Sequence, residues 1–269
     1  MNNVELLAPA GNFSKLKTAL YFGADAAYLG GKEFSLRSFA DNFSREELVS
    51  AVKYAHALGK KVYVTVNIYA KNADLAPMED YFAFLQEAGA DAALISDPGV
   101  LAAAKKCAPG LPVHISTQAN ITNKYAVKFW REQGASRTVL ARELSLAEIA
   151  EIHAYVPDIE LEAFVHGAMC ISYSGRCLLS DYLTGRPSNR GECAQACRWN
   201  YSIRKNDDKS DSGWLGLEED ERGAYILNSK DLNMSAHLKE MSEAGVYSFK
   251  IEGRMKSEYY LATVINAYR

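Results

Sequence analysis

Several sequence signals that define common protein classes are missing from this chain of 269 residues. It contains no long uncharged apolar run, which excludes a membrane-spanning helix. Its first residues, MNNVELLAPAGN, include no basic and apolar leader, so we expect a cytoplasmic protein rather than a secreted one. The net charge of −3 excludes a basic surface over the whole molecule, and any contact with nucleic acid must therefore use a local basic patch.

Two familiar site motifs are missing as well. The first apolar run is followed by APAGN (8–12), which is not the glycine-rich phosphate loop of a dinucleotide-binding sheet. The five histidines show no H-x-x-x-H spacing, which argues against a zinc hydrolase. We therefore expect His114 and His166 to be hydrogen-bonded polar residues rather than metal ligands.

One short pattern recurs along the chain: an amphipathic helix, a Gly-Ala or Gly-Val turn, and a short apolar strand. Apolar runs of this kind are typical of strands buried on both faces of a parallel sheet. Eight such runs are present, at 4–8, 26–30, 61–67, 92–96, 113–117, 138–141, 161–167 and 247–253. Eight strand–helix units in roughly 250 residues predict an α/β fold of the TIM (β/α)8 type, with a doubly wound open sheet as the alternative.

The segments between the strands carry helix signals. Residues 44–60 place Leu48, Val52 and Ala55 at helical spacing after a serine cap at Ser44. The last helix, expected at 257–268, is the eighth of the barrel. We therefore predict a single barrel domain over residues 1–269 and no separate C-terminal domain.

The spacing of the units breaks once. About eighty residues separate the seventh strand from the eighth, where roughly twenty-five suffice in a regular barrel. This predicts an insertion at 168–245 on the C-terminal face of the barrel, where active sites are built. Its later part, 199–231, reads as a β-hairpin with a charged tip at 205–213.

The insertion contains four of the five cysteines, with the spacing C-x6-C-x15-C-x3-C. In a reducing compartment, clustered cysteines are more often metal ligands or catalysts than disulfides. Zinc sites favour shorter C-x2-C or C-x4-C spacings, so these gaps fit an iron–sulfur cluster better. Cys107 follows the apolar helix VLAAAKKC and is expected to be a packed thiol. The predicted ligands are Cys170, Cys177, Cys193 and Cys197.

Polar side chains follow the ends of several predicted strands and would meet at the barrel mouth. The candidate catalytic residues are Glu162, His166 and Glu252, and the candidate substrate-binding residues are Arg37, Asn67, Gln118, Arg142, Lys250 and Arg254. Two of the acids have an equally good structural interpretation, because Glu162 and Glu252 can form ion pairs with Lys250, Arg254 or Arg142. Arg37 can hold a carboxylate or phosphate, or pack its stem on neighbouring aromatic rings.

The segment EAFVHGAMCISYSGRCLLS (162–180) resembles the signature of the collagenase-like peptidases, the peptidase family of unknown mechanism numbered thirty-two. The matching positions are Glu162, Phe164, Gly167, Ala168, Met169, Cys170, Gly175, Cys177, Leu179 and Ser180. Family-like segments also occur at 5–12, 28–43, 228–232 and 248–260, so the resemblance covers nearly the whole chain.

The resemblance implies a function that differs from the family name. Well-understood branches are oxygen-independent hydroxylases with an iron–sulfur cluster on four cysteines. One of them hydroxylates the wobble uridine of tRNA, with prephenate implicated as the hydroxyl source. GECAQACRW (191–199) resembles this branch, and Asn233 stands where other branches have their fourth cysteine, which fits Cys197 as the fourth ligand.

The resemblance therefore implies a [4Fe-4S] enzyme that hydroxylates RNA at the wobble uridine of tRNA, with a prephenate-like carboxylate as co-substrate. A homologous partner subunit is a further possibility. Three alternatives stay open: a peptidase, a hydroxylase of a small aromatic quinone precursor, and a binding protein with structural zinc. The peptidase has the weaker chemical basis, because Cys170 with His166 is its only nearby thiol–imidazole pair and leaves three cysteines unexplained.

Overall fold

The computed structural model of this protein describes residues 4–36, 41–199, 219–220, 223–224 and 231–269. The predicted ligand-binding residue Arg37 and the predicted hairpin tip at 205–213 lie outside these residues. Among the helices in the described part, none combines the length and the apolar character needed to cross a bilayer.

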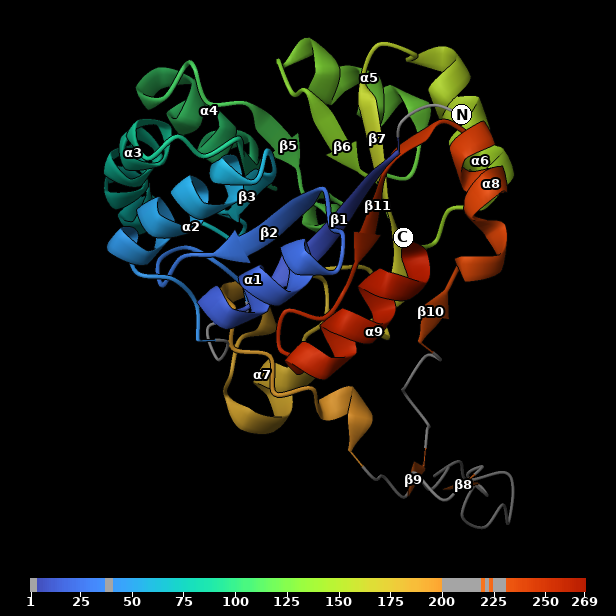
Figure 1. Ribbon diagram of the computed structural model, residues 1–269. Helices are drawn as coiled ribbons and strands as arrows, with labels where there is room; N and C mark the ends of the chain where they lie inside the picture. The colour runs from blue at the N-terminus through green and yellow to red at the C-terminus, as the bar shows by residue number, and fades with distance from the viewer. Residues whose placement is uncertain (1–3, 37–40, 200–218, 221–222, 225–230) are drawn as a thin grey trace, which may run out of the picture.

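Eight parallel strands form a closed barrel (Figure 1). β7 pairs with both β6 and β11, and β11 pairs in turn with β1, so the ring has no open edge. This closure confirms the predicted TIM-type barrel and excludes the open sheet. In order around the ring the strands are β1 (Glu5–Ala10), β2 (Ala26–Gly30), β3 (Lys61–Thr65), β4 (Ala92–Ile95), β5 (Val113–Ile115), β6 (Arg137–Val139), β7 (Glu160–Gly167) and β11 (Val246–Ile251).

Helices surround the barrel, and their first turns follow the sequence signals. The predicted cap Ser44 accepts a hydrogen bond from the backbone N–H of Glu47, whose carboxylate accepts one from the N–H of Ser44, and this capping box starts α2. Ser257 caps the last helix by a single bond, in which its hydroxyl accepts from the backbone N–H of Tyr260. The helices of this layer are α1 (Phe13–Tyr21), α2 (Arg45–Ala57), α3 (Asn72–Glu87), α4 (Pro98–Cys107), α5 (Lys124–Glu132), α6 (Leu146–Tyr155), α8 (Leu238–Glu243) and α9 (Glu258–Tyr268).

The hydrophobic core is divided between two places. The larger part lies between the outer face of the barrel and the helices. A small apolar cluster fills one part of the barrel interior, from Leu7, Ala26, Tyr28, Tyr63, Ala92 and Leu94. Many of the remaining interior positions are polar or charged, among them Glu5, His114, Arg137, Glu162 and Lys250, so the barrel holds a chemical site as well as a packed core.

The insertion between β7 and β11 begins with a segment that we call the cap, residues 168–199. It contains α7 (Leu179–Thr184) and two 3-10 turns, Ser188–Arg190 and Ala196–Arg198. Figure 1 shows the cap beneath the barrel, beside the start of α9, at the end towards which the strands point. Within the predicted hairpin region, β8 (Glu219–Asp220) and β9 (Gly223–Ala224) pair antiparallel. Directly after this region, β10 (Leu232–Asn233) pairs antiparallel with the end of β7.

Candidate functional site at the barrel mouth

A pocket of about 120 Å³ lies between the C-terminal ends of the strands and the cap. Nine of the thirteen predicted site residues line it, although they come from segments far apart in the sequence. They are Asn67, Gln118, Arg142, Cys170, Cys177, Cys193, Lys250, Glu252 and Arg254. The C-terminal face of the barrel is thus where the predicted polar residues and cysteines meet.

The first loop of the cap is fixed to the barrel by side chains from two neighbouring strand ends. The guanidinium of Arg142 donates to the carbonyl oxygen of Ala168 at 3.0 Å and to Oγ of Ser174 at 2.9 Å. Asn120 donates to the carbonyl oxygen of Ser174 at 3.0 Å. These bonds hold the backbone on both sides of Cys170 and place the predicted ligand over the pocket.

A second set of bonds fixes the later part of the cap. Arg190 forms an ion pair with Asp74 at the start of α3 (2.9 Å) and donates to the carbonyl oxygen of Tyr69. Ser188 donates to the carbonyl oxygen of Cys177 at 2.6 Å. Arg190 therefore has a structural role, since it docks the cap on the loop that follows β3.

The four clustered cysteines are close enough to influence one another electrostatically. Burial raises the pKa of the Cys197 thiol, and the other three cysteines raise it further, whereas Arg198 opposes them. Three of the sulfurs line the pocket, and Cys197 lies beside it in the 3-10 turn at 196–198. Cys107 ends α4 in the outer layer of helices and has no part in this group.

The donor set has the chemistry that an iron–sulfur cluster requires. In the described part of the chain, no group of three or more His, Cys, Asp or Glu side chains is arranged to hold one metal ion. Four cysteines gathered in one short segment, three of them lining the pocket, supply the thiolate donors that an iron–sulfur cluster requires.

Positive charge is concentrated at the floor of the pocket. Arg254 is buried and donates from Nη1 to Oγ of Ser35 (2.8 Å) and to Oγ1 of Thr65 (2.9 Å). The buried ammonium of Lys250 lies 4.4 Å from the centre of the Tyr28 ring. The charge of Lys250 is balanced by Glu162 at 2.6 Å, so Arg254 and Arg142 are the side chains that favour an anionic ligand in a region that little water reaches.

Two further polar side chains differ in how they are used. The side chain of Asn67 accepts from the backbone N–H of Leu36 and donates to Ser116, so it fixes neighbouring loops. The buried amide oxygen of Gln118 has no hydrogen-bond partner among the described residues. An unpartnered buried acceptor in a pocket is suited to a hydroxyl or N–H group of a ligand.

Glu162 lies below the pocket, in the interior of the barrel, and the ion-pair interpretation applies to it. Its carboxylate is 2.6 Å from Lys250 and 3.0 Å from Arg137. Burial by itself raises the pKa of Glu162, but the charges of Lys250 and Arg137 outweigh burial and hold this pKa below its usual value. A carboxylate that stays ionised between two cations is poorly suited to transfer protons.

His166 does not line the pocket, and the reason is a bulge in its strand. Strict alternation along β7 would place Glu162, Phe164 and His166 on the inner face. The pairing with β11 shifts between Lys250 and Ile251, so β7 carries one extra residue there. His166 is therefore turned towards α9, where Nδ1 lies 3.2 Å from the hydroxyl of Tyr268.

Sequence reasoning missed Arg137, which has the largest set of ion pairs in the barrel interior. Its guanidinium contacts Glu5 at 2.6 Å, Glu160 at 2.7 Å and Glu162 at 3.0 Å. Arg137 stands at the first position of its strand, at the end of the barrel opposite the mouth where active-site residues are expected. The signal was present as a charged residue directly before the apolar run 138–141.

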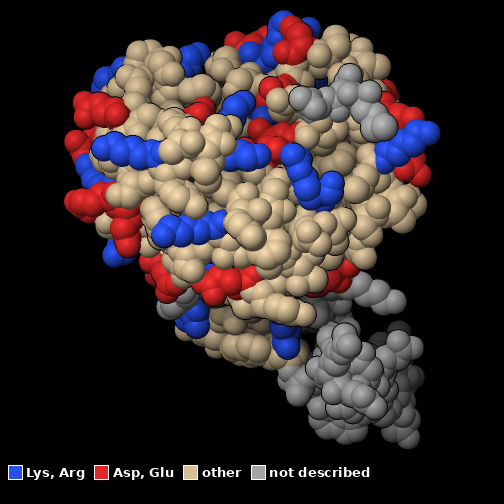
Figure 2. Space-filling model, in the orientation of Figure 1, with Lys and Arg blue, Asp and Glu red and all other residues tan. Residues whose placement is uncertain are grey.

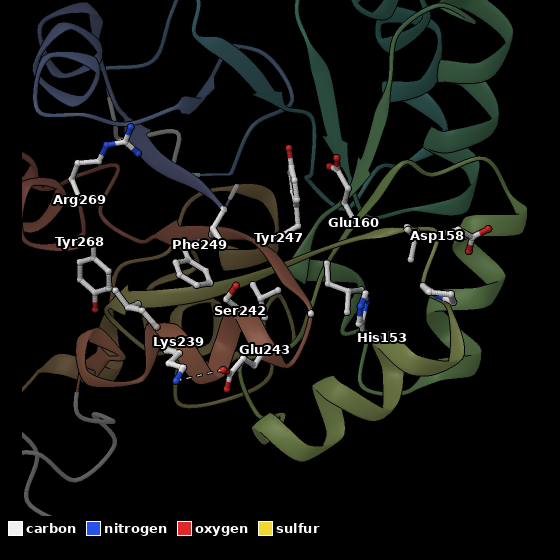
Figure 3. Close-up of a pocket in the computed structure, with 17 residues that line it drawn as sticks. His153, Asp158, Glu160, Lys239, Ser242, Glu243, Tyr247, Phe249, Tyr268 and Arg269 are labelled. Carbon is white, nitrogen blue, oxygen red and sulfur yellow. Dashed lines mark ion pairs between the residues drawn. The ribbon is translucent and has the colours of Figure 1, made fainter. Parts of the chain in front are cut away.

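A larger cavity of about 1000 Å³ lies at the opposite end of the barrel (Figure 3). It is lined by the first residues of β7 and β11 and by α8 and the end of α9. Its charged groups are already paired: Glu160 with Arg137, Asp158 with Arg131, Lys239 with Glu243, and Arg269 with Asp25. We therefore place the chemical site at the cysteine pocket.

The fold and this site define an α/β barrel whose mouth is covered by a cysteine-bearing cap. The model of peptidase family U32 matches residues 11–269, and the chain belongs to that family. A solved U32 peptidase structure has the same fold, with a TM-score of 0.62 and 13% identity over 96% of each chain.

Three relatives show the range of names within the family. A "tRNA hydroxylation protein P1" of Bacillus subtilis is 48% identical over 98% of this chain. A 23S rRNA 5-hydroxycytidine synthase of Escherichia coli is 38% identical over the whole chain, and a "Collagenase" of Porphyromonas gingivalis is 35% identical. The chain spans 62% of the length of the first, 39% of the second and 65% of the third.

Proposed function

We propose that this protein hydroxylates a pyrimidine base of RNA without molecular oxygen, and that its substrate is the wobble uridine of tRNA. The observation that carries the proposal is the pocket in which Cys170, Cys177 and Cys193 face Arg142, Lys250 and Arg254. The relatives named for hydroxylation of tRNA and rRNA support it, because they are similar over 98% or more of this chain.

In this proposal Cys170, Cys177, Cys193 and Cys197 hold a [4Fe-4S] cluster between the cap and the barrel. When bound, such a cluster supplies one-electron transfer at the pocket. The hydrogen bonds from Arg142, Asn120 and Ser188 keep the cap backbone in place around the ligands. These supporting contacts are the kind that orient ligands and tune a metal group.

The cations at the floor bind the carboxylates of a prephenate-like hydroxyl donor. Arg254 is about 4% exposed, so an ion pair with the donor is only weakly screened by water, and Lys250, paired with Glu162, contributes as a hydrogen-bond donor. The unpartnered oxygen of Gln118 accepts a hydrogen bond from the donor hydroxyl. Of the three predicted acid–base residues only Glu252 lines the pocket, and we assign proton transfer to it.

The first test measures the cofactor. Protein purified without oxygen is expected to contain iron and sulfide, and replacement of any of the four clustered cysteines by serine should remove most of the iron. Cys107→Ser is the matched control and should keep it, because Cys107 ends an outer helix. Stoichiometric zinc without sulfide in the wild-type protein would contradict the cluster.

The second test measures the product. Deletion of the gene should abolish a 5-hydroxyuridine-type mark on tRNA, and Arg254→Gln should reduce the mark at least tenfold while the iron content is unchanged. The expected loss corresponds to a charge-assisted contact of about 1.5–3 kcal/mol.

The peptidase alternative predicts the opposite pattern. Gelatin would be cleaved by protein without iron, the activity would depend on one cysteine, and tRNA would be unchanged in the deletion strain. The position of His166 on the outer side of β7 disfavours this outcome, because the only nearby imidazole faces Tyr268.

A further inference from the structure

Exposed large apolar side chains are concentrated in the cap. Of thirteen such side chains in the described residues, six lie within 170–199, and Met255 and Tyr259 lie just before and in the first turn of α9. The six in the cap are Ile171, Tyr173, Leu178, Tyr182, Leu183 and Trp199. A concentration of this kind marks an interaction surface.

One of these residues lies at the pocket itself, and hydrogen bonds connect the segments that carry the others. Tyr173 lines the pocket together with three of the cysteines. The Ser180 hydroxyl donates to the carbonyl oxygen of Arg186 and accepts from the N–H of Ala194, which joins α7 to the later cap. Gln195 contacts the sulfur of Met255 at 4.0 Å, so the cap also meets the segment before α9.

The cap is basic although the chain as a whole is acidic. Residues 168–199 contain four arginines and only two acidic residues, Asp181 and Glu192, whereas the net charge of the chain is −3. Within the described residues neither Arg176 nor Arg198 forms an ion pair. Figure 2 shows the lobe beneath the barrel as largely uncharged, with basic side chains at its edge. Exposed rings among unpaired arginines fit a partner with flat apolar groups and negative charge.

We propose that this surface, formed by the cap and the start of α9, binds single-stranded RNA. Tyr173, Tyr182, Trp199 and Tyr259 stack on unpaired bases, while Arg176 and Arg198 contact phosphates. The proposal rests on the proposed function, because an enzyme that modifies a base in a pocket must take the base out of its stack. RNA beside this pocket is therefore unpaired, and aromatic rings bind unpaired bases without regard to sequence.

The test compares matched tyrosines in the intact, anaerobically prepared protein. Tyr182 and Tyr21 both lie on helices and are 86% and 84% exposed, so neither side chain supports the fold. Binding of a short fluorescent oligouridylate should weaken about tenfold for Tyr182→Ala, a change of ~1.4 kcal/mol that one stacked base typically supplies. Tyr182→Phe, which keeps the ring, and Tyr21→Ala should bind like the wild type.

A second measurement examines the phosphates. Affinity falls as salt rises, and the steepness of this fall reports the number of phosphates contacted. Arg176→Ala and Arg198→Ala should each make the slope of log affinity against log salt less negative by about 0.7, the value for one phosphate of a single strand. A blunt RNA duplex of equal length should bind the wild-type protein at least tenfold more weakly than the single strand does.

Any of three results would contradict the RNA-binding role of this surface. The first is equal affinity of Tyr182→Ala and Tyr21→Ala for oligouridylate. The second is equal binding of single-stranded and duplex RNA, and the third is that Tyr182→Ala loses self-association instead of RNA binding. The proposed function is judged separately. If the tRNA mark depends on the gene while Tyr182→Ala binds normally, the function stands and the surface fails. If Tyr182→Ala loses oligouridylate affinity but the mark does not depend on the gene, the surface stands and the function fails.

Discussion

At the scale of single residues, the surroundings of His114 inside the barrel determine its protonation state. The ring of His114 lies edge-on to Tyr63, with centroids 4.7 Å apart, and is almost completely buried. Its Nδ1 has no hydrogen-bond partner among the described residues. Burial, together with the positive charge of Arg137, lowers the pKa of His114 to about 3, so the imidazole is neutral in the folded protein.

This neutral histidine predicts a loss of stability in mild acid. An unfolded histidine titrates near 6.5, so below that pH the unfolded chain binds more protons than the folded one, and stability falls as pH falls. The loss attributable to His114 should reach ~2 kcal/mol at pH 5 relative to neutral pH. Urea unfolding at several pH values should show a shallower dependence for His114→Phe, which keeps the ring and does not titrate.

If the free energy of unfolding of His114→Phe falls with pH as steeply as that of the wild type, groups other than His114 control the loss of stability in acid. His166 contributes in the same direction, because burial also lowers its pKa, so the slope of the variant should be reduced rather than abolished.

At the scale of secondary structure elements, the turn from β7 into the cap decides where the cysteines lie. Gly167 ends β7 with φ +109°, and an added Cβ would lie 2.8 Å from the carbonyl oxygen of Glu252. Both the backbone angle and the close approach require glycine at this position. Three residues later Cys170 enters the pocket, so the turn sets the direction of the whole cap.

We expect Gly167→Ala to destabilise the protein by ~3 kcal/mol and to lower its iron content. Gly185→Ala is the matched control in the same cap. Gly185 also has positive φ, +68°, but an added Cβ meets nothing within 4 Å, so only the backbone cost of about 1 kcal/mol applies. Thermal unfolding and iron analysis of both variants test this, and equal effects would mean that the contact with Glu252 is unimportant.

At the scale of the whole molecule, one buried ionic network connects strands from opposite ends of the sequence. Glu5 on β1, Arg137 on β6, Glu162 on β7 and Lys250 on β11 are joined through contacts of 2.6–3.0 Å. Ser248 on β11 and Tyr63 on β3 also donate to Glu5, at 2.8 and 2.6 Å. The network spans the place where β11 closes the ring between β7 and β1.

Removal of one charge from this network should lower the free energy of unfolding. Glu162→Gln leaves Lys250 with no carboxylate at ion-pair distance among the described residues and deprives Arg137 of one partner, and we expect a loss of about 3–5 kcal/mol in the free energy of unfolding. The double variant Glu162→Leu with Lys250→Met removes both members of the close pair and should recover part of that loss. A Glu162→Gln protein as stable as the wild type would show that the network is not needed for closure.

The sequence by itself determined the features that depend on neighbours along the chain. Apolar runs gave the eight barrel strands within a few residues, because a strand buried on both faces needs them. Ser44 and Glu47 determined the start of α2, because a capping box closes within one turn. The gap of about eighty residues before the eighth strand identified the insertion that contains the cap, because a regular barrel needs far fewer residues there.

Only the tertiary structure decided which side chains meet. The bulge that turns His166 away depends on the register with β11, more than eighty residues later in the sequence. The partners of Arg137 come from β1 and β7, so no local pattern could identify them. Burial and ion pairing are properties of the closed ring. The roles of Glu162 as a structural charge and of Lys250 as part of the pocket floor therefore emerge only when β11 joins β7 to β1.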